Sequence, residues 1–365
     1  MMGNQACAEG ALAAGCSFYA GYPITPSSEI METLADRLPR EGKVFVQMED
    51  EIGSICAVIG ASWAGAKAMT ATAGPGLSLM MEGLGYAAFT ETPCVIVDVQ
   101  RAGPATGQAT RVGSGDILQV RFGMHGDVCP IALSPGSVQE MYDLTIRAFN
   151  LAERYRVPVF LMADEGIGHL RESVFLHKDF TIENRVRDAS RPPFGTPEPD
   201  GVPPMPVFGD GAELMITGST HDEKGFRKVD DPEPHRRLVE RINRKILDHE
   251  ADIVEVEERF LDDATVAVVA YGFTGRSALA AVKALRRDGV RAGLVRLKTL
   301  WPFPRAALAR LDQRVQRVVV PEMNRGQVAM LVRAEMNAEV VSLCQTDGEV
   351  IEPEAIAARV REVLP

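Results

Sequence analysis

The apolar run Pro93-Cys-Val-Ile-Val-Asp98 decides the fold of the first half of this chain. It lacks the period-two alternation of a half-exposed strand, which is typical of a parallel sheet covered on both faces. Similar β-branched runs occur at residues 44–48, 70–72 and 157–162. Between them lie Ala-rich stretches with helical periodicity, at residues 5–14, 28–38, 53–66, 77–88 and 138–155. This alternation predicts a doubly wound α/β domain over residues 1–185.

The remaining sequence predicts an arm and a second α/β domain. Seven prolines between residues 185 and 207 prevent a regular element. Residues 186–262 are therefore expected to form an extended arm, a short strand from Leu214, a turn at 222–225 and a long charged helix over about 233–260. The charges of that helix should face solvent or a partner. Strand-like runs at 265–271, 290–297 and 317–320, with a turn at 272–275 into a helix ending near Arg286, predict the second domain over residues 263–365.

Composition and charge exclude several classes of function. The 365 residues carry 39 Lys and Arg against 50 Asp and Glu, a formal charge of −11, so nucleic acid and anionic membranes are unlikely partners. No basic residue precedes Arg37, so the sequence lacks the basic region of a secretory signal. The most apolar stretch, residues 56–72, is interrupted by Lys67 and is too short to span a bilayer. We therefore expect a cytoplasmic protein with no nucleic-acid partner and no membrane segment.

Two common cofactor motifs are absent. The six cysteines are scattered without a C-x-x-C pair, which predicts neither a zinc site nor an iron–sulfur cluster in this chain. No G-x-G-x-x-G follows a strand, which disfavours dinucleotide binding. Gly209-Asp210-Gly211 imitates the start of the metal–diphosphate motif of thiamine enzymes, but it follows a proline-rich arm, and the nearest downstream asparagine, Asn243, is distant. We expect no metal site there.

The loop Gly21-Tyr-Pro-Ile-Thr-Pro-Ser-Ser28 is the first candidate for a functional segment. Its two prolines restrict the backbone and present Thr25 between them, while Ser27 or Ser28 can cap the following helix. A capped turn without function is an equal interpretation from this spacing alone.

A second candidate is the acidic run Glu49-Asp-Glu51, where a buried strand meets a helix. The helix dipole favours acidic residues there without any function. The carboxyl ends of strands are also where open α/β sheets bind ligands. We expect Glu51 to point into the crevice, and Glu49 and Asp50 to cap the helix or face water.

The third candidate is the glycine-rich loop of residues 100–111, directly after the 94–99 strand. Its Arg101 and Arg111 can bind an anionic substrate through forked guanidinium donors. The alternative is a solvated loop with surface arginines. The run Thr70-Ala-Thr-Ala-Gly-Pro-Gly76 adds a tight loop that lets a ligand approach the backbone.

Together these segments resemble the α subunit of the 2-oxoacid:ferredoxin oxidoreductases over nearly the whole chain. The resemblance rests on the segments 22–28 (YPITPSS), 48–52 (MEDEI), 61–66 (ASWAGA), 101–107 (RAGPATG), 301–304 (WPFP) and 322–327 (EMNRGQ). The stretch at 216–225, ITGSTHDEKG, is most similar to the 2-oxoglutarate branch of that family.

The resemblance implies a thiamine-diphosphate-binding, pyrimidine-type doubly wound domain followed by an α/β domain like the C-terminal domain of transketolase. It implies oxidative decarboxylation of a 2-oxoacid on thiamine diphosphate, with an acyl-coenzyme A as product and ferredoxin as electron acceptor. Glu51 matches the carboxylate that bonds N1′ of the cofactor's aminopyrimidine. Thr25 and Arg101 match catalytic and substrate-binding positions, Thr110 matches the second residue of the carboxylate-binding pair, and further cofactor contacts fall on Tyr22, Pro23, Thr72 and Gly74.

The resemblance also implies partner chains, because this sequence lacks a diphosphate–Mg²⁺ motif and a cluster-binding cysteine set. A β subunit is expected to supply the diphosphate side, Mg²⁺ and a [4Fe–4S] cluster. A separate γ subunit and a ferredoxin-like δ subunit are also expected. Branched-chain 2-oxoacids and pyruvate remain rival substrates to 2-oxoglutarate. A nicotinamide dehydrogenase and a non-catalytic α/β scaffold remain the alternatives from other classes.

Overall fold

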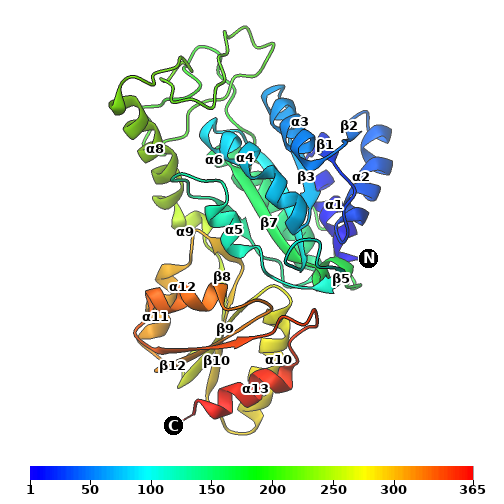
Figure 1. Cartoon of the computed structure of the whole chain (residues 1–365), viewed down its shortest axis with the longest axis vertical. Coiled ribbons are helices and arrows are strands. Elements are labelled where there is room, and N and C mark those ends of the chain that lie inside the picture. The colour runs from blue at the N-terminus through cyan, green and yellow to red at the C-terminus, as the bar shows by residue number, and fades with distance from the viewer. Residues whose placement is uncertain (365) are drawn as a thin grey trace.

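The computed structural model describes residues 1–364 and contains two sheets, each with its own helices. The larger lies in the upper part of Figure 1 and the smaller below it. The larger sheet has eight strands in the order β11-β6-β7-β4-β3-β1-β2, with β5 paired to β4. Its strands are β1 Phe18–Gly21, β2 Val44–Gln47, β3 Ala68–Thr72, β4 Cys94–Ala102, β5 Gln108–Val112, β6 Ile131–Leu133, β7 Pro158–Asp164 and β11 Thr299–Trp301.

The larger sheet is covered on both faces, as its apolar strands indicate. Side chains of β4 alternate between two cores, with Val95 and Val97 in one and Ile96 in the other. Helices α1 Gly3–Ala13, α2 Ser28–Arg40 and α6 Val138–Tyr155 contribute to the first core, and α3 Glu51–Trp63, α4 Gly74–Phe89 and α5 Ile117–Phe122 to the second. The short helix α7 Glu165–His169 follows β7. Strands β5 and β11 run antiparallel to their neighbours, so the sheet is mixed rather than wholly parallel.

The smaller sheet has five strands in the order β13-β12-β9-β10-β8. These are β8 Val256–Arg259, β9 Val266–Tyr271, β10 Ala292–Leu297, β12 Arg317–Glu322 and β13 Glu339–Cys344, with helices α10 Thr274–Arg287, α11 Arg305–Asp312, α12 Gln327–Glu335 and α13 Pro353–Glu362. All pairs are parallel except β8 with β10.

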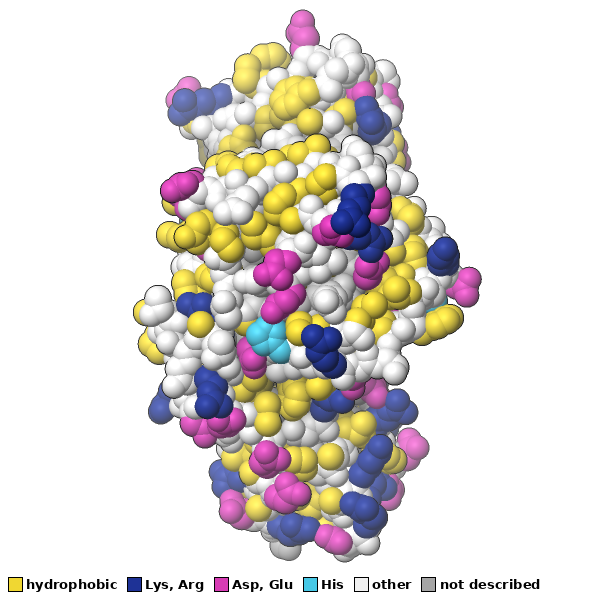
Figure 2. Space-filling model, turned by 90° about the vertical axis from the view of Figure 1, so that its right-hand side faces the viewer, with side chains coloured by type: hydrophobic (Ala, Val, Ile, Leu, Met, Phe, Trp, Pro, Cys, Tyr) yellow, Lys and Arg dark blue, Asp and Glu magenta, His cyan; other side chains and the backbone are white. Residues whose placement is uncertain are grey.

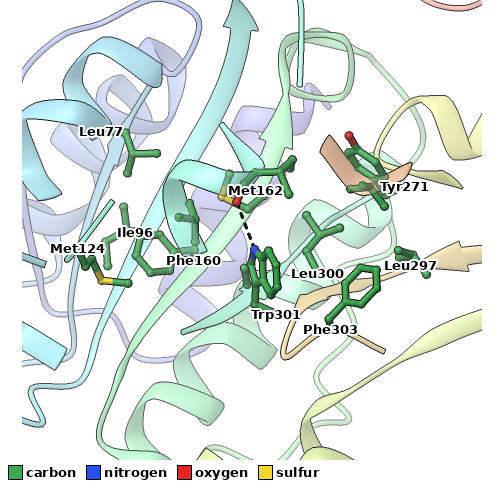
Figure 3. Packing of buried hydrophobic residues seen from close by; sticks show 14 of the residues in the cluster. Leu77, Ile96, Met124, Phe160, Met162, Tyr271, Leu297, Leu300, Trp301 and Phe303 are labelled. Carbon is green, nitrogen blue, oxygen red and sulfur yellow. Dashed lines mark hydrogen bonds between the residues drawn. The ribbon is translucent and has the colours of Figure 1, made fainter. Parts of the chain in front are cut away.

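Strand β11 connects the two units, because it follows β10 in the chain but pairs with β6 of the larger sheet. Its Trp301 is buried and its indole N–H donates to the carbonyl of Ile117 at 3.2 Å. Figure 3 shows Trp301 near Met162 of β7 on one side and Phe303 on the other. Apolar side chains of both units therefore share one continuous core.

The expected long helix over residues 233–260 is wrong in its second half. Helix α8 covers Pro232–Leu247, a short α9 follows at Glu250–Ile253, and the chain then forms β8 at the edge of the smaller sheet. The expected strand from Leu214 is also absent, since the only pairing between residues 208 and 231 is an isolated bridge between His221 and Arg227. Both errors arise because charge patterns are local, whereas strand pairing depends on distant partners.

The charges of α8 do not all face solvent. Lys245 is buried and donates to the Glu91 carboxylate at 2.7 Å, and Arg241 donates to the same carboxylate at 2.6 Å. The expectation that the charges of this helix face solvent or a partner is therefore wrong for Arg241 and Lys245. A carboxylate buried at the end of α4 recruits these cations, because an unpaired buried charge is costly.

The proline-rich arm contains no helix or strand between residues 185 and 207, as expected. It is fixed against the first unit by buried cations rather than left as a free linker. Arg156 donates to the carbonyls of Pro193 and Pro204 at 2.6 and 2.8 Å, and Arg185 donates to Glu153 at 2.8 Å. No helix within residues 1–364 combines the length and apolar character needed to cross a bilayer.

Candidate active site

A cavity of about 610 Å³ lies where the two units meet. The first unit contributes the start of α4 and the end of β4, and the second contributes the loop after β12. Its lining includes Gly74, Pro75, Arg101, Asp116, Asn324 and Arg325. The site therefore lies at the carboxyl end of β4, where an open α/β sheet binds ligands.

Arg101 connects the cavity with the Thr25 loop. Its guanidinium donates from Nη1 to the Thr25 carbonyl at 2.7 Å, while its buried Nε has no partner among the described residues. Arg101 is only 8% exposed, so few water molecules can hydrogen-bond to its guanidinium. The guanidinium donors that do not bond Thr25 fit an anionic ligand in the cavity that Arg101 lines.

The Thr25 loop differs in one respect from the expectation. The Ser27 hydroxyl donates back to the Ile24 carbonyl at 2.9 Å, and α2 has no side-chain cap. The expected serine cap is therefore wrong, because the hydroxyl closes the preceding turn instead. Thr25 is half-buried, whereas Tyr22 and Pro23 are exposed.

Glu51 is the first residue of α3 and is 5% exposed. Asp50 caps the helix by accepting from the Gly53 N–H at 2.7 Å, and Glu49 is exposed, as expected for these two residues. A Cβ at Gly76 would lie 2.4 Å from Glu51 Oε1 and 2.2 Å from Thr72 Oγ1. Glu51 and Thr72 therefore converge on the start of α4, where a side chain on Gly76 would displace them.

The surroundings of Glu51 fit the thiamine diphosphate that the resemblance implies. The hydrogen bonds among residues 1–364 include none to the Glu51 carboxylate, although buried carboxylates normally have donors. A protonated ring nitrogen is a suitable donor for it. No group of three or more His, Cys, Asp or Glu side chains within residues 1–364 is placed to hold a metal ion.

The segment expected as a glycine-rich loop is a β-hairpin. Strand β4 continues to Ala102, and β5 returns antiparallel, with Arg101 opposite Val112. Thr110 is exposed on β5 and is not part of the cavity lining. Arg111 forms an exposed ion pair with Glu349, which agrees with the surface-arginine alternative for this residue. The loop expectation is wrong because glycines alone do not reveal antiparallel pairing.

Sequence reasoning missed a pair of acids behind the cavity. Asp98 lies in β4 opposite Thr72 of β3 and is fully buried, and Asp116 precedes α5. Neither oxygen of Asp98 nor Oδ2 of Asp116 has a hydrogen-bond partner among the described residues, and the two carboxyl groups are near enough for each to influence the pKa of the other. Burial, then the charge of Asp116, raises the pKa of Asp98 well above its usual range, and burial raises the pKa of Asp116 to about 6. The sequence signal for this pair was Asp98 itself, an aspartate at the end of the apolar run 93–98.

A second missed feature holds the loop after β12. The Asn324 amide donates to the Ser114 carbonyl and to the Tyr271 hydroxyl, both at 2.8 Å, and Tyr271 donates to Glu322 at 3.1 Å. Burial raises the pKa of Tyr271 well above its usual range and also raises that of Glu322. This network joins the two units at the cavity and places the exposed Arg325 on its wall. The 322–327 motif carries part of the resemblance, but nothing in the sequence gave these residues a role.

Two family models together match most of the chain. Residues 9–241 match the thiamine-diphosphate-binding domain of pyruvate flavodoxin/ferredoxin oxidoreductase, and residues 264–356 match core domain II of pyruvate:ferredoxin oxidoreductase.

Curated relatives and solved structures agree with these models. The chain is 53% identical to 2-oxoglutarate synthase subunit KorA of Methanothermobacter thermautotrophicus, over 98% of this chain and 96% of that protein. It is 37% identical to ketoisovalerate oxidoreductase subunit VorB of the same organism, over 99% and 96% of the two chains. It is also similar to a structure of 2-oxoglutarate:ferredoxin oxidoreductase from Magnetococcus marinus with 2-oxoglutarate, coenzyme A and succinyl-CoA bound, with a TM-score of 0.91 and 35% identity. This chain covers 64% of that longer chain, and 99% of its own residues are matched.

The fold class expected from the sequence is confirmed by these matches. A split-gene transketolase, at 14% identity and a TM-score of 0.60, shares the fold. The first family model covers more than half of the residues and describes a thiamine-diphosphate-binding domain. The curated relatives are named as subunits, which indicates a multi-subunit enzyme. The chain belongs to the family of the 2-oxoacid:ferredoxin oxidoreductases.

Proposed function

We propose that this chain is the α subunit of an enzyme that oxidatively decarboxylates 2-oxoglutarate. The products are succinyl-CoA and CO₂, the electron pair passes to ferredoxin, and the reverse carboxylation is open to the same site. The observation that carries the proposal is the buried Glu51 side chain at the start of α3, which packs against Gly76 of α4, whose first residues line the same cavity as Arg101. The higher identity to KorA than to VorB, 53% against 37%, supports 2-oxoglutarate over a branched-chain 2-oxoacid.

Thiamine diphosphate is the proposed cofactor, shared with a partner subunit. When bound, it supplies an electron sink for the pair left behind as the carboxylate departs as CO₂. Glu51 would accept a hydrogen bond from N1′ of the aminopyrimidine and so fix which ring nitrogen carries the proton. Thr72, Gly74 and the exposed Tyr22 and Pro23 are the proposed further contacts to the cofactor.

Arg101 is proposed to bind the substrate carboxylate next to the reacting carbonyl. That carboxylate leaves during the reaction, so it must be held in a defined geometry as well as attracted. The Arg101 bond to the Thr25 carbonyl fixes Nη1 of the guanidinium and leaves Nη2, which makes no hydrogen bond among the described residues, for the substrate in the cavity. Thr25 would then lie beside the reacting carbonyl. Thr110 is the weakest of the proposed contacts, because it is exposed outside the cavity.

A β subunit is the proposed partner that completes the site, with Mg²⁺ and a [4Fe–4S] cluster in partner chains. Large apolar side chains stand exposed beside the proposed cofactor residues, namely Tyr22 at 41%, Ile52 at 51% and Leu79 at 50%. The face on the α2 side carries apolar side chains in a band across its upper half, and charges of both signs lie over the second unit (Figure 2). Separate γ and ferredoxin-like δ subunits are proposed as well.

Three segments are the proposed organisation of the chain. Residues 1–185 form the pyrimidine-side domain, 186–262 the arm and charged helix, and 263–365 the domain similar to the C-terminal domain of transketolase. The pairing of β8 with β10 places residues 256–259 in the sheet of the last domain, although they precede residue 263.

The substrate is tested by assaying the complex that co-purifies with this chain against a panel of 2-oxoacids, with coenzyme A and a viologen acceptor. We expect the highest kcat/KM with 2-oxoglutarate. A higher kcat/KM with pyruvate or 2-oxoisovalerate would replace the substrate but keep the reaction. No acceptor reduction with any 2-oxoacid by a complex that contains all its subunits would refute the proposed reaction and leave the scaffold alternative.

The role of Glu51 is tested by Glu51→Gln, which keeps the shape and removes the charge. We expect turnover to fall by about 10²-fold or more, the range of a positioned acid–base group, with a smaller effect on cofactor affinity. Glu49→Gln is the matched control, because Glu49 is exposed two residues earlier. Unchanged turnover in Glu51→Gln, or a loss in Glu49→Gln alone, contradicts the assignment.

A further inference from the structure

The Asp98–Asp116 pair lies against the proposed active site and has no role in the function described above. Asp116 lines the cavity, and a Cβ on Gly74 would lie 2.9 Å from its Oδ2. Asp98 is fully buried behind it in β4. Both Asp98 oxygens and Asp116 Oδ2 are buried without a hydrogen-bond partner among the described residues. A buried carboxyl pair with no cation in direct contact is an unusual arrangement that needs an explanation.

Two ionised carboxylates in contact are strongly disfavoured in a buried site, so such pairs hold one proton between them. The charged groups around this pair come from three elements. Arg101 follows Asp98 on β4, Arg325 lines the same cavity from the loop after β12, and Glu51 lies at the start of α3 against Thr72. Arg101 acts on Asp116 through its charge without a hydrogen bond to it, because its guanidinium donates to the Thr25 carbonyl instead. The guanidinium therefore interacts electrostatically with the pair, but its hydrogen-bond donors are not used by it.

We propose that Asp98 and Asp116 share one proton in the working enzyme and thereby leave Arg101 available for the substrate carboxylate. With one proton the pair carries a single negative charge, and Asp116 competes weakly for the guanidinium. Without that proton, Asp116 becomes a full rival to the substrate for Arg101. Asp98 and Asp116 are thus positioning residues that act through Arg101, and the inference rests on the proposed function of Arg101.

The proposal fixes the sign of a pH dependence. Burial raises the pKa of both carboxyl groups, and the charge of Asp116 raises that of Asp98 further, so the shared proton is present at lower pH and is lost as the pH rises. Substrate affinity should therefore fall with rising pH. If substrate binding moves the apparent pKa of the pair by about one unit, KM changes by about tenfold across the titration. The effect belongs mainly to KM, since the proton acts on carboxylate binding.

The kinetic test compares the assembled wild-type complex with its Asp98→Asn variant from about pH 7 to about pH 9, above the pKa of about 6 to which burial raises Asp116. The asparagine keeps the shape and can donate to Asp116, which then carries one charge at every pH in this range. We expect the wild-type KM for the 2-oxoacid to rise by about tenfold and the variant KM to stay flat. Asp116→Asn is a second variant with the same expected flat profile, and Asp179→Asn, at an exposed position, is the control that keeps the wild-type profile. A rise in both asparagine variants equal to that in wild type would overturn the proposal.

A spectroscopic test does not depend on turnover. The infrared carbonyl band of a protonated carboxylic acid, recorded on the resting complex, should appear in the wild-type minus Asp98→Asn difference spectrum and disappear as the pH rises. If the complex turns over no 2-oxoacid, the proposed function fails while this band still reports the shared proton. If turnover is normal and the difference spectrum has no acid band at any pH, the shared proton is refuted and the proposed function stands.

Discussion

Replacing Arg101 by lysine tests how the substrate carboxylate is held. Lysine keeps the positive charge but loses the planar fork of donors. In the structure, Nη1 of that fork bonds the Thr25 carbonyl at 2.7 Å, and Nη2 of this cavity-lining side chain makes no hydrogen bond among the described residues. A single ammonium group at the end of a flexible chain cannot hold both partners in the same directions. We therefore expect Arg101→Lys to lose at least one charge-assisted hydrogen bond in the complex with substrate.

The structure sets the size of the loss. A hydrogen bond to a charged group contributes about 1.5–3 kcal/mol. Since about 1.4 kcal/mol corresponds to a factor of ten, kcat/KM should fall by roughly 10- to 150-fold. The net charge of the site is unchanged, so the loss measures geometry rather than electrostatic attraction. Both KM and kcat should be affected, because the lost contact holds the carboxylate before and during its departure.

The assay is steady-state kinetics of the assembled complex with saturating thiamine diphosphate and coenzyme A. Arg111→Lys is the matched control, because Arg111 lies on the same hairpin but is 52% exposed and paired with Glu349. An exposed ion pair contributes about 0–1 kcal/mol, so we expect its kcat/KM to stay within about threefold of wild type. A larger loss in Arg111→Lys than in Arg101→Lys would refute the assignment and move the carboxylate site to β5.

Two further predictions concern the start and the end of α4. Gly76→Ala places a Cβ 2.4 Å from Glu51 Oε1, so the carboxylate must move, and we expect turnover to fall by about tenfold or more. Gly60→Ala is the control, because nothing lies within 4 Å of the new Cβ there. Unchanged turnover in Gly76→Ala would show that the position of Glu51 is not critical. Glu91→Gln leaves Arg241 and Lys245 without their buried counter-ion. In denaturant titrations it should lower the free energy of unfolding by about 3–5 kcal/mol. The control is Glu82→Gln at an exposed position, which should lower it by about 0.5 kcal/mol or less. Burial acts to raise the pKa of Glu91, but the two cations hold it below its usual range, so its stabilisation is present above the unfolded-state pKa and is lost as the pH falls; an equal acid sensitivity in Glu91→Gln would contradict this.

Much of the fold could be read from local sequence patterns. The apolar runs at 93–98, 70–72 and 157–162 predict central strands, because burial on both faces demands apolar side chains at successive positions. The similar run at 44–48 forms β2, which is a partly exposed edge strand. Helices such as α6 show their periodicity over many residues and are recovered within a residue or two. The Glu49-Asp-Glu51 run predicts a helix start, and Asp50 is indeed its cap. These features depend on residues near one another in the chain.

The candidate site could be predicted only in part from local sequence patterns. Glu51, Arg101 and Thr25 could be nominated because they follow strands and occupy family motifs. Asp98 could not be paired with Asp116, because 17 intervening residues, including the β4–β5 hairpin, separate the two carboxyl groups. Asn324 and Arg325 reach the cavity only because the second unit packs against the first. Sequence patterns identify residue types near strand ends but not which distant groups face them.

The sequence by itself determined the α/β class, the central strands, the order of the two units and the motifs that mark the family. Tertiary structure alone decided that α8 ends at Leu247 so that β8 can pair with β10, and that β11 returns to the larger sheet. It also decided that Lys245 is buried against Glu91, and that Asp98 and Asp116 meet behind Arg101. The physical reason is the range of the interactions. Helical periodicity and capping act over a few residues, whereas strand pairing, charge burial and carboxyl coupling depend on contacts that exist only after the chain has folded.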